Sequence, residues 1–560
     1  MATASSRRWI LPAAVVVVVL AAGAFVLRGR VTGGANAAAG PSTTVHPASK
    51  LSVKPGSGVI VDGIFEEPNL LNPTQGPTMT FGGMVMTTMF ANLYQITPAG
   101  HIVPFIATSL PKVSPNGLTY TFNLKHTEWN NGTPFTAADV VATWHLIMSP
   151  GYIAASTVGW SDVKSITYPK SNPYTFTIQL KQPFPALVAD CFGTDYPGIV
   201  PAQVFAHLTG KAANNAAYDH DPTITNGPFE FKSWTPGVSI TVVPNPHWFG
   251  PAPKSKEIVF EVIPNDNALL ADAQSHSINV YYFDSITQVK QLQAIPGAKV
   301  YFTTQPAWEG ITLNEKNPFL RSVKVRQALQ MAINTPVLIK DVWKGHALPA
   351  AADQPPDSFA HNPALKPWPY DPARSRQLLK QAGFKMGPGG YLEKGGKTFS
   401  LVYSTTSDNP WRALDQELIQ VWFKAIGVKV TIKDYPANAY FGTVLPSEKG
   451  WDMGEFEYAE GYDPLAGMQP VYGTGGVNNY ASYSNPTLDK LFAEAGVATS
   501  HAKEQSLLRQ AEVIIHNQLP QLFLYSPQEI DTSIDMTGYV PNPYMIDTWN
   551  CWQWATTAKS

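Results

Sequence analysis

The chain has 560 residues, a formal net charge of −2 and only 14% charged residues, against roughly 25% in an average globular protein. A chain of this length exceeds what one hydrophobic core supports, so two or three lobes are expected and a single small module is excluded. The 11% of aromatic residues argues against intrinsic disorder. The body of the chain carries no basic cluster, which excludes nucleic acid as a partner.

The N-terminus carries an export or anchoring signal. The apolar residues 9–27 lie between two pairs of arginines, and they are about as numerous as a membrane-crossing helix requires. Residues 1–30 are therefore either a membrane anchor helix or a signal peptide, for which the small residues at 35–39 offer cleavage points. In both cases the rest of the chain lies outside the cytoplasm, in the periplasmic space or at the outer face of the membrane. Residues 31–58, rich in Gly, Ala, Pro, Ser and Thr, predict a flexible linker.

The chain has two cysteines, Cys191 and Cys551. Their small number is compatible with an oxidising compartment. If they were paired, they would tie the C-terminal tail to the first half of the chain. A disulfide candidate and two buried free thiols therefore remain open as alternatives, because sequence alone does not show proximity.

From residue 59 onward, segments typical of strands and of helices alternate. Residues 118–124 and 174–180 alternate apolar and polar side chains, which predicts two β-strands. Residues 428–433 predict a third. Helix starts are indicated at Thr136 to Asp139, Thr335-Pro336, Asp371-Pro372, Asn409-Pro410 and Asn485-Pro486. The pattern predicts a mixed α/β protein of at least two lobes.

A run of acidic and aromatic residues stands out in the second half, where residues 455–464 read EFEYAEGYDP. If residues 454–458 form a strand, its two glutamates point to one face and its two aromatic residues to the other. Glu460 and Asp463 then lie in the loop beyond the strand, where ligand-binding residues concentrate. The alternative is a solvated acidic edge, or a simple turn at Asp463-Pro464.

Several motifs resemble one known family. The motifs are GLTYTFNLK at 117–125, EWNNGTPFTAADVV at 128–141, NGPFEFKSW at 226–234, VKVRQALQMAI at 323–333, YDPARSRQLLKQAGF at 370–384, IGVKVTI at 426–432 and NYASYSNPTLDKL at 479–491. In this order they resemble the extracellular solute-binding proteins of family 5, the dipeptide- and oligopeptide-binding components of ABC importers. The resemblance covers nearly all of residues 59–530.

The resemblance implies an architecture. It predicts the α/β, two-lobed periplasmic-binding-protein fold of type II, in the large variant with an extra β-rich subdomain and a hinge between the lobes. Lobe I is expected at residues 59–304 plus 520–560, and lobe II at residues 305–519. A monomer is expected that captures peptides between closing lobes and delivers them to the permease and ATPase subunits of the importer.

The resemblance also implies a ligand site. In the family, an acid on a lobe II loop pairs with the amino group of the peptide, and the match places Glu460 at that position. A carboxylate sealed between lobes requires a cationic partner, so Asp463 in the same loop is a further candidate. Tyr458 and Tyr462 offer aromatic surfaces that tolerate varied side chains.

One departure concerns the carboxylate end of a peptide. Dipeptide-selective members carry an arginine in the loop where this chain reads TTSDNPW at 405–411, and Arg412 follows a little late. A fixed dipeptide clamp is therefore not expected, which favours longer peptides or another solute. Trp308 and Trp411 are the aromatic candidates among 15 tryptophans, and such rings also suit an oligosaccharide.

No enzyme signature is visible. The chain has no H-E-x-x-H, G-x-S-x-G, P-loop or C-x-x-C motif, and its histidines are scattered. Neither a metal site nor a cofactor is expected. A glycosidase using two of the clustered acids is the least favoured interpretation, because those acids lie within one strand and its loop. An anchored sensor of the same fold remains the other alternative to transport.

Overall fold

The computed structural model describes residues 57–76, 80–194, 198–208, 210–214, 216–282, 286–407, 409–459 and 461–557. The predicted anchor or signal segment and most of the predicted linker lie outside the described residues, as does Glu460. Among the helices of the described residues, none combines the length and the apolar character that crossing a membrane requires.

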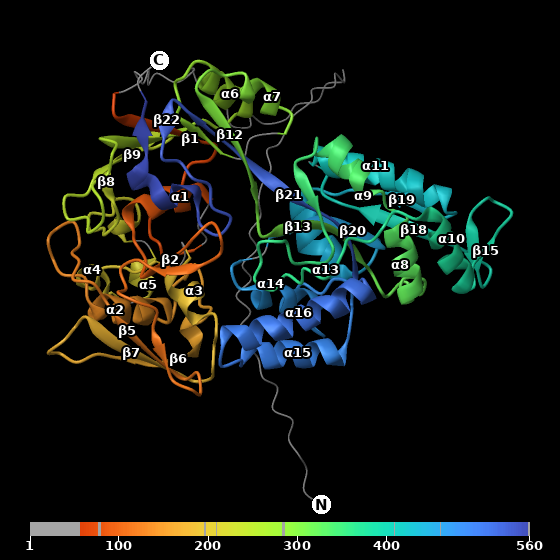
Figure 1. Ribbon diagram of the computed structural model, residues 1–560, viewed down its shortest axis with the longest axis horizontal. Coiled ribbons are helices and arrows are strands. Elements are labelled where there is room, and N and C mark those ends of the chain that lie inside the picture. Colours follow the sequence, from red (N-terminus) through yellow and green to blue (C-terminus); the bar gives the residue numbers. More distant parts are fainter. Residues whose placement is uncertain are drawn as a thin grey trace, which may run out of the picture.

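One long mixed sheet runs through both halves of the molecule. Its strands follow the order β19-β18-β20-β13-β21-β11-β1-β10-β9-β8, and β12 and β14 also pair with β21. Strand β21 (Gln521–Ile534) pairs through its first part with β13 (Ala307–Leu313) and through its second part with β12 (Ala298–Thr304). This strand therefore passes from one half to the other, as Figure 1 shows. The structure therefore consists of two α/β halves that share one sheet.

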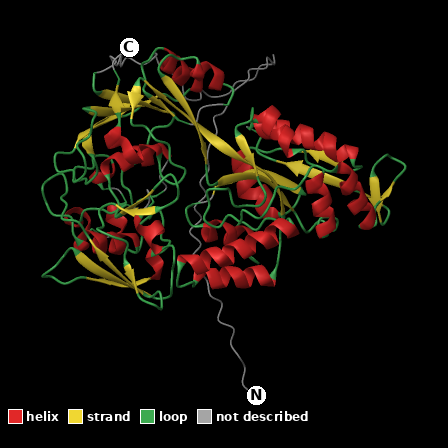
Figure 2. Ribbon diagram, in the orientation of Figure 1, coloured by secondary structure: helices red, strands yellow, loops and turns green. Residues whose placement is uncertain are grey.

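The first half combines a main sheet with a smaller one. Strand β1 (Val59–Ile64) lies parallel to β10 (Glu257–Val262), and β9 (Ser239–Pro244) and β8 (Phe229–Thr235) continue that edge. The separate four-stranded sheet has the order β4-β5-β7-β6. Its strands are β4 (Lys112–Val113), β5 (Thr119–Asn123), β7 (Thr175–Leu180) and β6 (Val163–Thr167). Figure 2 shows this smaller sheet at the end of the first half.

Helices cover both faces of the sheet in the second half. Its strands are β18 (Ser400–Ser404), β19 (Lys429–Ile432) and β20 (Met453–Ala459). One face packs against α8 (Val323–Met331), α10 (Pro372–Gln381) and α11 (Pro410–Ala425). The other face packs against α14 (Pro464–Tyr472), α15 (Pro486–Gly496) and α16 (His501–Gln518). Because strand side chains alternate, the neighbours Leu522 and Phe523 of β21 enter opposite cores.

The predicted helix starts are confirmed by their caps. Helix α2 (Ala137–Ile147) begins with a capping box in which Asp139 Oδ2 accepts from the Thr136 amide at 2.8 Å. Helices α10, α11 and α15 each begin with a proline after an Asp or Asn whose side chain accepts backbone N–H groups. The start at Thr335-Pro336 gives only the short helix α9 (Thr335–Val337), followed by a π-helical turn at Leu338–Val342.

The two cysteines are free thiols in separate cores, which corrects the disulfide candidate. Cys191 lies in α3 (Leu187–Phe192), inside the core of the smaller sheet, whereas Cys551 packs in the core beside α1 (Thr80–Met89). Both side chains are fully buried, and burial raises the pKa of each thiol well above its usual value. Each behaves as a small apolar side chain.

Candidate functional site

The acidic run folds as strand β20, with its side chains divided between the two faces as predicted. Phe456 and Tyr458 enter the core under α14 to α16. Glu457 lies directly opposite Glu309 of β13. Like charges facing each other across a strand pair are unfavourable, so this pair requires a compensating cation.

Arg412 supplies that cation from the first turn of α11. Its Nε donates to Glu309 Oε1 at 2.9 Å and its Nη2 donates to Oε2 at 3.1 Å, a bidentate pair. The Arg412 side chain is 12% exposed and that of Glu309 is fully buried. Burial opposes the charge on Arg412, but Glu309 more than offsets this effect and raises the pKa of the guanidinium. Arg412, a sequence candidate for ligand binding, is therefore engaged with the protein itself.

Two further carboxyl groups complete an acidic network on the same face. Tyr403 donates to Glu455 Oε2 at 2.5 Å, and Tyr525 donates to Asp415 Oδ2. Burial raises the pKa of Asp415 to about 7, and burial together with the charge of Asp415 raises the pKa of Glu455 well above its usual range. Nothing in the sequence marked Asp415 as a site residue.

Glu457 belongs to the same network, and its pKa is also raised. Burial raises its pKa to about 7, with Glu309 adding to the rise and Arg412 opposing it. Arg412 is the one cationic side chain among the described groups whose charges act on the carboxyls of Glu309, Asp415, Glu455 and Glu457. The network is therefore short of positive charge.

The aromatic candidates Trp308 and Tyr458 lie on the face of the sheet opposite this network, in the core under α14 to α16. Their rings stack with centroids 4.5 Å apart and an interplanar angle of 7°, and both are buried. The Tyr458 hydroxyl lies 2.8 Å from Thr312 Oγ1 and accepts from Gln521 Nε2 at 2.9 Å. Their contribution is to hold β13 against β20 rather than to present an exposed ring.

Trp411 lies beside Arg412 and is partly exposed. Its ring meets that of Trp343 edge to face at 5.9 Å, and Trp343 meets Tyr525 in the same way at 5.6 Å. Since Tyr525 also bonds to Asp415, these rings form an aromatic wall next to the acidic network.

Tyr462 and Asp463 lie where the two halves meet. The Tyr462 hydroxyl donates to the carbonyl oxygen of Gly100 in the first half at 3.2 Å, and its ring meets that of Tyr544 edge to face at 5.7 Å. Asp463 is 5% exposed and caps α14 by accepting from the Leu465 amide at 2.9 Å. Glu460 lies outside the described residues, and its neighbours Ala459 and Gly461 are exposed.

The contacts of Tyr462 and Tyr544 form the rim, the second place where the two halves meet. The Tyr544 hydroxyl donates to the Asp357 carbonyl oxygen of the second half. Burial raises the pKa of Asp190 in α3 of the first half well above its usual range, and the charges of Asp463 and Glu504 in the second half add to the rise, so these carboxyls lie near one another across the boundary. The structure thus has its two halves in contact.

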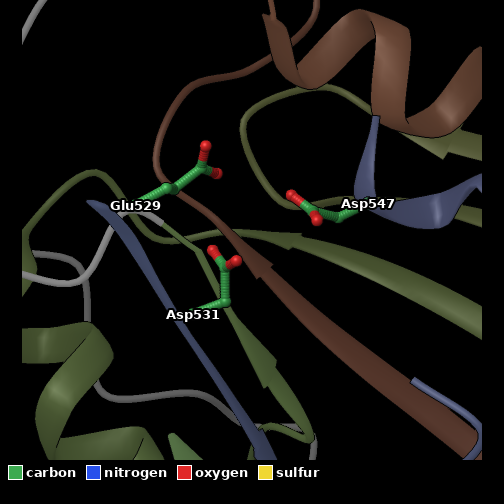
Figure 3. A group of neighbouring side chains, drawn as sticks. All are labelled: Glu529, Asp531 and Asp547. Carbon is green, nitrogen blue, oxygen red and sulfur yellow. The ribbon is translucent and has the colours of Figure 1, made fainter. Parts of the chain in front are cut away.

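A second acidic group lies on the other side of the crossing. The described residues gather Glu529, Asp531 and Asp547 with ligand atoms within 4.8 Å of one another, and Figure 3 shows the three side chains converging. The sequence predicted no metal site, because it carries no known metal-binding motif and its histidines are scattered. A signal that could have found it is the spacing of Glu529 and Asp531, because two acids two positions apart on a strand lie on the same face of the sheet.

Comparison with known proteins identifies the family. Residues 101–479 match the family described as bacterial extracellular solute-binding proteins, family 5 Middle. The chain belongs to this family. Both the family resemblance predicted from the sequence and the predicted fold class are therefore confirmed.

Individual relatives of this solute-binding protein differ in the ligands that their names state. Heme-binding protein A of Haemophilus influenzae is 28% identical over 472 residues, which cover 80% of this chain and 83% of that protein. Oligopeptide-binding protein AppA of Bacillus subtilis is 25% identical over 531 residues, which cover 92% of this chain and 95% of that protein. The structure of AppA in complex with a nonapeptide aligns with a TM-score of 0.70 and 24% identity, over 90% of this chain and 99% of that chain.

Proposed function

We propose that this protein captures a peptide carrying a positively charged group between its lobes and delivers it to the permease and ATPase of an ABC importer. The observation that carries the proposal is the excess of carboxyl groups near the crossing strands. Among the described residues, four carboxyls of the second half lie within reach of one cationic side chain, that of Arg412. Buried carboxyls in such excess favour a ligand that brings positive charge.

The engagement of Arg412 bears on peptide length. Because both nitrogens that face Glu309 already donate to it, the guanidinium is poorly placed to clamp the terminal carboxylate of a dipeptide. We therefore propose that the ligand is a longer peptide, which the protein holds by its positively charged end. The oligopeptide-binding AppA, matched over 92% of this chain, supports this choice.

Glu460 is the proposed partner of the peptide amino group. The proposal rests on the family resemblance and on the position of this residue directly after strand β20, between the exposed Ala459 and Gly461. In the closed state its charge would be desolvated and matched by the ammonium group. Glu460→Gln keeps the side-chain shape and deletes that attraction.

Calorimetry on four combinations tests the proposal: wild type and Glu460→Gln, each with a free and an N-acetylated peptide. Breaking one partner of a buried ion pair costs about 3–5 kcal/mol, or two to three decades in affinity. Acetylation should therefore weaken binding to wild type strongly and to the variant little further, since both changes remove the same pair. Glu494→Gln, at an acid on α15 whose side chain is 46% exposed, is the matched control and should lose less than about 1 kcal/mol. Additive losses, or no loss from either change, would show that the solute is not held by its amino end.

A further inference from the structure

The acids Glu529, Asp531 and Asp547 come together from two distant segments of the tail. Glu529 and Asp531 are two residues apart on β21, so they share one face of the sheet. Asp547 is the first residue of the 3₁₀ segment η5 (Asp547–Gln553). The three side chains each offer a carboxylate oxygen, and those oxygens lie within 4.8 Å of one another (Figure 3). A metal ion usually lies roughly 2.0–2.6 Å from its oxygen ligands, so one ion placed between these three oxygens could contact all of them.

The arrangement is costly without a cation. Asp531 is fully buried and Asp547 is 7% exposed, while Glu529 is partly exposed. The carboxyls of Asp531, Asp547 and Glu457 lie close enough to Glu529 for their charges to act on it. Three carboxyls held together in a buried space are stabilised by a positive charge and destabilised by one another.

A buried hydroxyl near the cluster supplies an independent sign of a ligand. Tyr539 is 5% exposed, and its hydroxyl oxygen forms no hydrogen bond with the described residues. Its ring lies 5.1 Å from that of Tyr301, which pairs directly with Asp531 across the β12–β21 ladder. The charges of Asp531, Asp547 and Glu529 all act on this hydroxyl. Buried polar groups almost always have a partner, so the hydroxyl indicates a partner other than the described residues.

Asp62 of β1 is a second buried side chain with a polar atom that has no hydrogen-bond partner among the described residues. Its side chain is fully buried, Oδ2 accepts from the Tyr282 hydroxyl at 3.1 Å, and Oδ1 has no hydrogen-bond partner among the described residues. The charge of Asp547 also acts on Asp62. Asp62 Oδ1 and the Tyr539 hydroxyl thus both lack a hydrogen-bond partner among the described residues, and the charge of Asp547 acts on both groups.

We propose that Glu529, Asp531 and Asp547 bind one oxygen-preferring divalent cation of the class of Ca²⁺, Mg²⁺ and Mn²⁺. All three ligands are carboxylates, and the polar neighbours are a hydroxyl and a fourth carboxylate, which is the donor set that hard cations prefer. The ion would join η5 to β21 next to the point where β21 enters the second half. The proposal does not depend on which solute the protein carries.

The test uses the full chain after dialysis against EDTA, titrated separately with CaCl₂, MgCl₂ and MnCl₂ by calorimetry and followed by thermal unfolding. We expect one of these ions to bind with one equivalent per chain and to raise the melting temperature. Asp531→Asn and Glu529→Gln should each weaken that binding by about tenfold or more, since loss of a ligand is at least as serious as loss of its supporting group. Glu494→Gln, at an exposed acid on α15 in the second half, should bind the ion as wild type does.

Two further measurements make the outcome decisive. Thermal unfolding of the ion-free variants verifies folding, and if Asp531→Asn does not fold, Glu529→Gln at the partly exposed position carries the test alone. Spermidine and a lysine-containing tripeptide are titrated in parallel as organic cations. The proposal is overturned if no ion binds saturably, if the variants bind it like wild type, or if only the organic cations bind and the variants abolish that binding.

Discussion

Asp463 combines a structural task with an unfavourable charge. Its carboxylate caps α14, yet the side chain is 5% exposed. Burial raises its pKa to about 7, and the nearby Glu504 adds to the rise. The folded protein therefore binds more protons at this residue than the unfolded chain does between about pH 4 and pH 7. Stability from this group is present at low pH and is lost as the pH rises through that window.

Asp463→Asn tests this assignment, because asparagine keeps the cap without the charge. At about pH 8 the variant should be more stable than wild type by roughly 2–4 kcal/mol, and at about pH 4 the two should agree. Urea unfolding at both values measures the difference. Asp371→Asn, at the partly exposed cap of α10, is the control and should show no such gain. A gain that is equal at both pH values would contradict the assignment.

The candidate residues show which features of individual side chains the sequence could predict. The alternation of the acidic run was predicted from its spacing alone, because strand geometry is local. That Arg412 meets Glu309 was not predictable, since the two are 103 residues apart and only the tertiary fold brings them together. Trp308 was a ligand candidate for its ring, but its burial depends on helices that follow much later in the chain.

At the scale of elements, β13 owes its close fit to Gly310. This glycine shares a face with Trp308, two positions earlier, and a Cβ there would overlap the Trp308 ring. The Cβ would also lie 3.0 Å from the Leu522 carbonyl oxygen of β21. The stack of Trp308 on Tyr458 thus depends on the missing side chain.

Gly310→Ala should therefore lower the free energy of unfolding by about 1–3 kcal/mol, through displacement of the Trp308 ring. The matched control is Gly442→Ala, where a Cβ meets no atom within 4 Å and no loss is expected. Urea midpoints of both variants, read with the tryptophan fluorescence spectrum, measure the effect. Equal midpoints would mean that the ring is not held in place by this contact.

The helix starts show where sequence prediction succeeds for elements. Caps at Asp371, Asn409 and Asn485 were recognised because the capping side chain bonds only to its own first turn. The start at Thr335-Pro336 gave less helix than its pattern indicated, since the chain continues as a π-helical turn that no local signal marks.

At the scale of the whole molecule, two halves share one sheet and touch again at the rim. The crossing is made by β21 and by the chain between β12 and β13, while Tyr462 and Tyr544 join the rim. The overall fold was predictable from ordered motifs spread over the chain. The acidic groups on both sides of the crossing were not, because only the tertiary fold brings β13 beside β20 and Asp547 beside β21.

Small-angle X-ray scattering with and without solute tests most directly that the two lobes close on a ligand. The probe is the peptide that binds most tightly in the calorimetric series, added at saturation to protein freed of co-purified solute. With peptide, the scattering curve should match the structure described here, in which the two halves are in contact. Without it, loss of the rim contacts of Tyr462 and Tyr544 should leave a larger radius of gyration. The same radius in both samples, despite saturation shown by calorimetry, would contradict capture between closing lobes.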